Sequence, residues 1–194
     1  MNTALLSIRN LKVVYTAGGV VVHAVNGISL DVMPGETLGI VGETGAGKTT
    51  TALSVLQLLP ERTGRITDGE VLYKGEDLLK KSRGDMRKIR GASISMIFQD
   101  PMTALNPIMS IGGQIMESLR IHNHDGRTEE ELESRVDALL QMVGISPSRK
   151  HDFPHQFSGG MKQRVVIAIS LACKPELIIA DEPTTALDVT IQAQ

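Results

Sequence analysis

The chain has 194 residues, of which 41% are hydrophobic and 22% are charged, and its formal net charge is −2. These values are typical of a globular domain and exclude intrinsic disorder and fibrous repeats. They give no charge-based reason to expect binding to nucleic acid or to an anionic membrane. The single cysteine, Cys173, excludes an internal disulfide framework and a four-cysteine metal site, and it indicates a reducing, cytoplasmic compartment.

No segment of the sequence is suited to crossing a membrane. The longest apolar stretch, Val165–Cys173, has nine residues, whereas a spanning helix needs about 20. The N-terminus also lacks a signal-peptide pattern, because Arg9 and Lys12 interrupt its apolar patch. We therefore expect any membrane role to act through a partner protein.

The first 41 residues predict β structure. Candidate strands are Leu6–Tyr15, Val20–Val25 and Ile28–Val32, and a short apolar run at Thr37–Val41 predicts a strand buried on both faces. A helix is expected after residue 47, because Ala52, Val55, Leu56 and Leu59 recur at helical spacing before Pro60. Further strands are expected at Glu70–Tyr73, Ser93–Phe98 and Leu177–Ala180.

Two more helices are indicated between and beyond these strands. Thr128 and Glu131 form a capping-box pattern ahead of an amphipathic segment that stops at Gly144, and Ser158 begins another helix. The basic run Lys80–Arg90 lacks aromatic residues and is interpreted as a solvated face rather than a nucleic-acid patch. Strands alternating with helices predict an α/β fold with a mainly parallel sheet.

A glycine-rich loop at Gly42–Thr49 matches the phosphate-loop pattern G-x-x-x-x-G-K-[ST] in full. Glycines let backbone N–H groups approach phosphate oxygens, and the helix that follows presents its positive end to the same anion. Lys48 would supply a cation to the β- and γ-phosphates, and Thr49 a hydroxyl to Mg²⁺. The alternative is a structural glycine turn. The residues expected to contact the nucleotide are Gly42, Glu43, Thr44, Gly45, Ala46, Gly47, Lys48, Thr49 and Thr50.

A second candidate site lies where the apolar run Leu177–Ala180 ends in Asp181 and Glu182. Ligands of open α/β sheets bind at this end of the strands. Asp181 is suited to hold Mg²⁺, and Glu182 to orient or deprotonate an attacking water. The alternative is that Asp181 only caps the next element.

The stretch Phe157-Ser158-Gly159-Gly160-Met161-Lys162-Gln163-Arg164 makes the chain resemble the nucleotide-binding domain of an ATP-binding cassette (ABC) transporter. The phosphate loop, Gln99-Asp100-Pro101, this signature, Asp181-Glu182 and Ala186-Leu187-Asp188 occur in the family's order. The resemblance implies a P-loop NTPase core with an N-terminal antiparallel β subdomain and an inserted helical subdomain. The core would comprise residues of about 1–98 and 161–194, and the helical subdomain about 99–160, of a single, incomplete domain.

The resemblance also implies roles for single residues. Ser158, Gly159 and Gly160 would close over ATP held by a second subunit, although an ordinary helix cap at Ser158 is the alternative. Tyr15 would stack on adenine, unless it is a strand aromatic that faces the core. Gln99 would contact Mg²⁺ and the attacking water, and Asp188 would act across the dimer interface.

Three segments are similar to importers of the dipeptide, oligopeptide and nickel group: Gln99–Pro107, Pro154–Met161 and Ala180–Thr190. The resemblance implies an ATP-hydrolysing subunit that binds ATP and Mg²⁺ on the cytoplasmic face of the cell membrane. Its partners would be membrane permease subunits, a second nucleotide-binding subunit in a homo- or heterodimer and, indirectly, a substrate-binding protein, with no nucleic acid. We expect the permease to dock on residues 99–144, near Ile108, Met109, Ile111 and Ile115, unless these apolar residues belong to a helical core.

Two features set limits on this interpretation. The family places a switch histidine after the Asp-Glu pair, whereas all five histidines of this chain precede Asp181. We therefore expect a C-terminally truncated subunit with weak activity. The single cysteine, Cys173, cannot by itself ligate an iron–sulfur cluster. The alternatives are a cassette ATPase of translation or DNA repair and a nucleotide-binding module without catalysis. A guanine-nucleotide switch is disfavoured because no Asn-Lys-x-Asp stretch occurs.

Overall fold

A computed structural model of the chain describes residues 3–182, so that the expected contact residue Asp188 lies outside the described range. The chain divides into two compact units, with the boundary between Arg87 and Lys88. Each unit is described by itself. No helix within residues 3–182 is long and apolar enough to cross a membrane.

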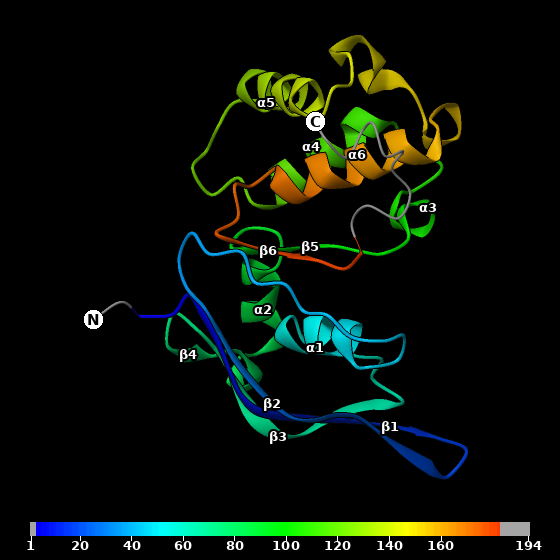
Figure 1. The fold of residues 1–194 in the computed structure, drawn as a ribbon. Coiled ribbons are helices and arrows are strands. Elements are labelled where there is room, and N and C mark those ends of the chain that lie inside the picture. The colour runs from blue at the N-terminus through cyan, green and yellow to red at the C-terminus, as the bar shows by residue number, and fades with distance from the viewer. Residues whose placement is uncertain (1–2, 183–194) are drawn as a thin grey trace. The chain divides into compact units, whose positions relative to one another are not determined.

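The N-terminal unit is built on a four-stranded antiparallel sheet with the strand order β2-β1-β3-β4 (Figure 1). Its strands are β1 (Leu6–Ala17), β2 (Val20–Val32), β3 (Gly64–Tyr73) and β4 (Glu76–Asp77). One face of this sheet is apolar and buried, with side chains from β1 and β3 that include Ile8, Leu11, Val13 and Val71. Charged residues of the sheet such as Arg9, Lys12 and Asp68 are exposed, as is usual for antiparallel sheets with one solvated face.

Two sequence-based expectations for strands in this unit are wrong. Val20–Val25 and Ile28–Val32 form one continuous strand, because the left-handed backbone of Gly27 (φ 87°) takes up the register shift. Thr37–Val41 is not a strand, and Val41 is 96% exposed. A strand forms where a neighbour satisfies its backbone N–H and C=O groups, and no strand of the described sheets pairs with this run.

Three helical elements complete this part of the chain: α1 (Lys48–Val55), the 3₁₀ helix η1 (Leu78–Lys80) and α2 (Arg83–Ile89). Helix α1 ends before the expected Pro60, because Gln57 adopts a left-handed backbone and Leu58 N donates to Leu53 O (2.8 Å). In the basic segment, Met86 is buried while its neighbours stay exposed. An ion pair at 2.8 Å links Arg83 to Glu61.

The C-terminal unit combines a parallel strand pair with a cluster of helices. The strands are β5 (Ile94–Ile97) and β6 (Leu177–Ala180), which pair in parallel from Ile94↔Leu177 to Ile97↔Ala180. The helical elements are α3 (Pro101–Ala104), α4 (Ile111–Ile121), α5 (Glu129–Met142), η2 (Pro147–His151), η3 (Pro154–Gln156) and α6 (Gly159–Leu171). The capping box at Thr128 is confirmed, since Thr128 and Glu131 exchange both hydrogen bonds.

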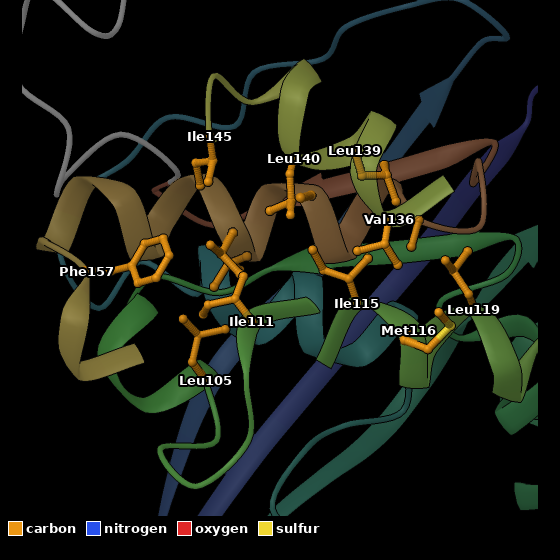
Figure 2. Close-up of a cluster of buried hydrophobic side chains, with 14 of the residues drawn as sticks. Leu105, Ile111, Ile115, Met116, Leu119, Val136, Leu139, Leu140, Ile145 and Phe157 are labelled. Atoms are coloured by element: carbon orange, nitrogen blue, oxygen red, sulfur yellow. The ribbon is translucent and has the colours of Figure 1, made fainter. Parts of the chain in front are cut away.

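A hydrophobic cluster made by α4, α5 and α6 holds this unit together (Figure 2). Ile111 and Ile115, which were expected to face a partner, are completely buried in it, whereas Ile108 is 82% exposed. They occupy the inward face of α4, where apolar residues repeat at helical spacing. The antiparallel sheet, the parallel pair and the helices confirm the α/β class.

Candidate functional site

The phosphate loop runs from Gly42 to the start of α1, and its glycines have distinct structural tasks. Gly45 and Gly47 adopt left-handed backbone conformations, with φ of 84° and 86°. A Cβ atom at Gly47 would lie only 2.4 Å from the carbonyl oxygen of Ala24 in β2. Gly47 is also the N-cap residue of α1. Glycine therefore allows the helix to begin directly against the sheet.

The side chain of Lys48 folds back over this loop. Its Nζ atom donates hydrogen bonds to the carbonyl oxygens of Gly42 (2.6 Å) and Glu43 (2.9 Å). The ammonium group is thus held within the loop, next to the N-terminus of α1. A fixed cation beside a helix N-terminus is suited to bind phosphate. Thr49 and Thr50 follow in the first turn of α1.

Tyr15, the expected adenine contact, lies against the same helix. Its hydroxyl is 3.5 Å from Oγ1 of Thr50, and across the β1–β3 ladder it pairs with Gly64. A Cβ atom added at Gly64 would meet Cε1 of the Tyr15 ring at 2.9 Å. The ring is partly buried rather than part of the core. The structure therefore brings Tyr15 and the phosphate loop together within the N-terminal unit.

In the C-terminal unit, the parallel strand pair brings three expected site residues to one edge. Because Ile97 pairs with Ala180, Gln99 and Glu182 each lie two residues beyond a paired position. Nε2 of Gln99 donates to Oε2 of Glu182 at 2.8 Å. Asp181 is largely buried, and its backbone N–H donates to Ile97 O at 2.9 Å. A buried and an exposed carboxylate thus stand side by side at this edge.

The backbone of Glu182 is also unusual. Its φ of 48° places a residue with a long side chain in the left-handed region. Such conformations are uncommon outside glycine and concentrate at functional sites. The alternative for Asp181, a cap on the following element, concerns residues beyond the described range.

The signature segment forms the N-terminus of α6. The Ser158 hydroxyl accepts from Met161 N (3.4 Å), so the helix cap that was the alternative is present. That cap does not require the next residue to be glycine. A Cβ atom at Gly159 would meet nothing within 4 Å, and its backbone does not fall in the left-handed region. The packing among residues 3–182 therefore gives no reason for glycine at this position.

Sequence reasoning missed Arg149, which contacts the signature segment from η2. Its guanidinium group lies 4.2 Å from the centre of the Phe157 ring and forms an ion pair with Asp152 at 2.8 Å. A basic residue in a polar segment matches no local motif. Nothing in the sequence shows that Arg149 contacts the signature. Only the folded geometry identifies it.

Comparisons with known proteins agree with these observations. The family model described as ABC transporter matches residues 25–185. The dipeptide transport ATP-binding protein DppD of Bacillus subtilis is 52% identical over 191 residues, which cover 97% of this chain and 56% of that protein. The oligopeptide transport ATP-binding protein OppD of the same organism is 48% identical over 194 residues, with 99% and 54% covered.

A solved structure gives the same result. The dimeric, post-hydrolysis state of an ATP-binding cassette bound to ADP and Pi is similar with a TM-score of 0.87 and 28% sequence identity, covering 97% of this chain and 78% of that one. The chain belongs to the ABC transporter family, which confirms the resemblance inferred from its motifs. It spans about half the length of the curated relatives that it matches.

Proposed function

We propose that this protein is the ATP-binding and ATP-hydrolysing subunit of an ABC importer for peptides. The observation that carries the proposal is the loop in which Lys48 is held by the carbonyl oxygens of Gly42 and Glu43 at the start of α1. The similarity to dipeptide and oligopeptide transport proteins supports the substrate class. The DNA-repair or translation alternative has no comparable support.

In this proposal, each expected site residue has its own role in the reaction. The loop from Gly42 to Thr50 holds the phosphates and Tyr15 stacks on adenine. Asp181 and the hydroxyl of Thr49 would supply oxygen ligands to Mg²⁺, and the ion would offset the negative charge of the phosphates. Glu182 accepts a proton from the attacking water or orients that water, and Gln99 contacts both water and metal.

The signature acts on a second subunit. Ser158, Gly159 and Gly160 close over ATP bound by the partner's phosphate loop, and Asp188 acts across the same interface. The space around Gly159, which no other residue of the described range 3–182 fills, supports this assignment. The solved relative is dimeric, which supports a pair of cassettes. Membrane permease subunits hold the pair at the cytoplasmic face of the membrane. Cargo is delivered by a substrate-binding protein.

Calorimetric titration of ATP into wild-type protein and the Lys48→Ala variant tests the nucleotide site. We expect measurable binding only in the wild type, because several phosphate charges lose their cation. Lys12→Ala, which breaks an exposed pair with Asp68, is the control and should bind normally. Equal affinities of the Lys48 variant and the wild type would refute the assignment. Co-purification with integral membrane proteins tests the transport role.

A further inference from the structure

Arg149 makes four different contacts around the start of α6. Its Nε atom pairs with Oδ2 of Asp152 at 2.8 Å, and Nη2 donates to Gln156 O at 3.1 Å. The guanidinium group lies over the Phe157 ring at 4.2 Å, and Nη1 approaches the sulfur of Met161 at 3.6 Å. One side chain thus contacts the chain on both sides of Ser158–Gly160.

The segment that carries Arg149 is itself anchored to the helical core. Asp152 O accepts from Ile111 N at the start of α4 (2.8 Å). The neighbouring Lys150 pairs with Asp137 of α5 at 3.1 Å. Its backbone also packs so closely on Gly112 that a Cβ atom there would come within 2.8 Å of the Lys150 carbonyl oxygen. The backbone that carries Arg149 is therefore held in place against α4 and α5.

We infer that Arg149 is a positioning residue for the signature. It fixes the direction in which the backbone N–H groups of Ser158–Gly160 point when they meet the phosphates of the partner subunit's ATP. The inference rests on the proposed function, since it assigns that role to the signature. The inference adds that the orientation of Ser158–Gly160 depends on a residue outside the signature.

The contacts require arginine rather than any cation. A guanidinium group is planar, stacks on an aromatic face and directs several N–H donors at fixed angles. A lysine can replace the charge opposite Asp152, but its tetrahedral ammonium group has no planar face to lie over Phe157 and does not reproduce the fork geometry of the guanidinium N–H donors. Arg149→Lys therefore distinguishes an effect on the orientation of Ser158–Gly160 from an effect of positive charge alone.

The experiment compares Arg149→Lys and Arg149→Met with wild type in the complete protein. Three quantities are measured: the Kd for ATP, kcat at saturating ATP, and the midpoint of thermal unfolding. Arg120→Lys is the matched control, because Arg120 forms an exposed pair with Glu129 between α4 and α5 and touches no signature residue. A displacement of about 1 Å can lower a rate roughly 10²-fold.

We expect both Arg149 variants to lose at least tenfold in kcat while their Kd for ATP stays within twofold of wild type. Arg120→Lys should match wild type in both. Normal kcat in the Arg149 variants would overturn the inference, and so would parallel losses of kcat, ATP binding and melting temperature, since these indicate a purely structural role. Gly159→Asp tests the signature itself. If that variant turns over normally, the proposed role of the signature fails rather than the role of Arg149.

Discussion

The side-chain amide of Gln99 donates a hydrogen bond of 2.8 Å to the carboxylate of Glu182, across the ends of two neighbouring parallel strands. The amide leaves the second carboxylate oxygen of Glu182 outside this bond. In the proposed mechanism, that carboxylate accepts a proton from water, and the amide keeps it oriented. The pair therefore links Glu182 to the segment that contains Ile108 and α4.

Replacing Glu182 by glutamine should separate catalysis from binding. The variant retains the shape of the side chain and can still accept a hydrogen bond from Gln99, but it cannot take up a proton. We expect kcat to fall by about 10²-fold or more, a typical loss when a general base is removed, while ATP affinity is retained. Phosphate release and equilibrium binding are the measurements. Wild-type turnover in Glu182→Gln would exclude Glu182 as the base.

Gly47→Ala should destabilise the N-terminal unit more than an ordinary glycine replacement. Alanine at Gly47 combines a left-handed backbone with an approach of 2.4 Å to Ala24 O, whereas Gly35 (φ 76°) has the same backbone strain and open space around it. Left-handed strain costs about 1–2 kcal/mol and overpacking about 1–3 kcal/mol more.

The difference in stability between Gly47→Ala and Gly35→Ala thus measures the effect of the close approach to Ala24 alone. We expect thermal unfolding of Gly47→Ala to begin several degrees below that of Gly35→Ala, because about 2 kcal/mol shifts the melting temperature of a chain of this size by about 4–8 °C. Equal melting temperatures would show that the close approach to Ala24 carries no energetic weight.

Local patterns predicted much of this fold, because they depend on nearest neighbours in the sequence. The capping box of Thr128, the cap at Ser158 and the buried run Ile94–Ile97 follow from side-chain chemistry and periodicity. The register of β5 against β6 does not, because a pairing between residues 97 and 180 leaves no local trace. The contact between Gln99 and Glu182 was therefore beyond sequence reasoning.

The errors have the same origin. Thr37–Val41 has the composition of a buried strand, yet a strand also needs a partner, and composition does not specify one. Ile111 and Ile115 were assigned to a partner surface, although apolar residues that follow Gln99 suit a partner surface and a buried core equally well. Burial decides between the two roles, and burial is a property of the packed helices.

Cross-linking from Ile108 tests whether a permease docks on the exposed part of residues 99–144. Cys173 is the only cysteine, so Cys173→Ser gives a background without thiols. In that background, Ile108→Cys should cross-link to a membrane permease, because residue 108 is exposed, whereas Ile111→Cys should not, because residue 111 is buried. Cross-links that form only from the N-terminal hairpin, for example from Val21→Cys, would move the docking surface elsewhere.

Alkylation of Cys173 should depend on pH in a way that reports its environment. Burial raises the pKa of the thiol, and this outweighs the opposing effect of Arg127 and Arg135. Because the thiolate is the reactive form, the native protein should react with iodoacetamide only at higher pH than the urea-unfolded chain does.

The same raised pKa predicts a direction for stability. The folded state holds the thiol proton of Cys173 more tightly than the unfolded state does. Its contribution to the free energy of unfolding is therefore present below the unfolded pKa of about 8.5, and it is lost as pH rises through the folded pKa. Cys173→Ser should remove this alkaline loss. Identical alkylation profiles for native and unfolded protein would contradict both expectations.

Gly64→Ala should weaken ATP binding through the base rather than through the phosphates. The added methyl would stand 2.9 Å from Cε1 of Tyr15 and 3.1 Å from Cβ of Leu59. The tyrosine ring, whose hydroxyl lies 3.5 Å from Thr50 Oγ1, is the group that must move. If Tyr15 stacks on adenine, Gly64→Ala should lower ATP affinity severalfold and leave the affinity for tripolyphosphate unchanged.

Fluorescence offers a direct readout, because the chain has no tryptophan and two tyrosines. Tyr73→Phe leaves Tyr15 as the only fluorophore, and ATP should quench it while tripolyphosphate should not. Gly84→Ala is the control, since its added methyl would make only an ordinary contact of 3.6 Å with Ser82 Oγ. If ATP binds Gly64→Ala and wild type equally well and leaves Tyr15 fluorescence unchanged, then Tyr15 belongs to the sheet and α1, and adenine is bound elsewhere.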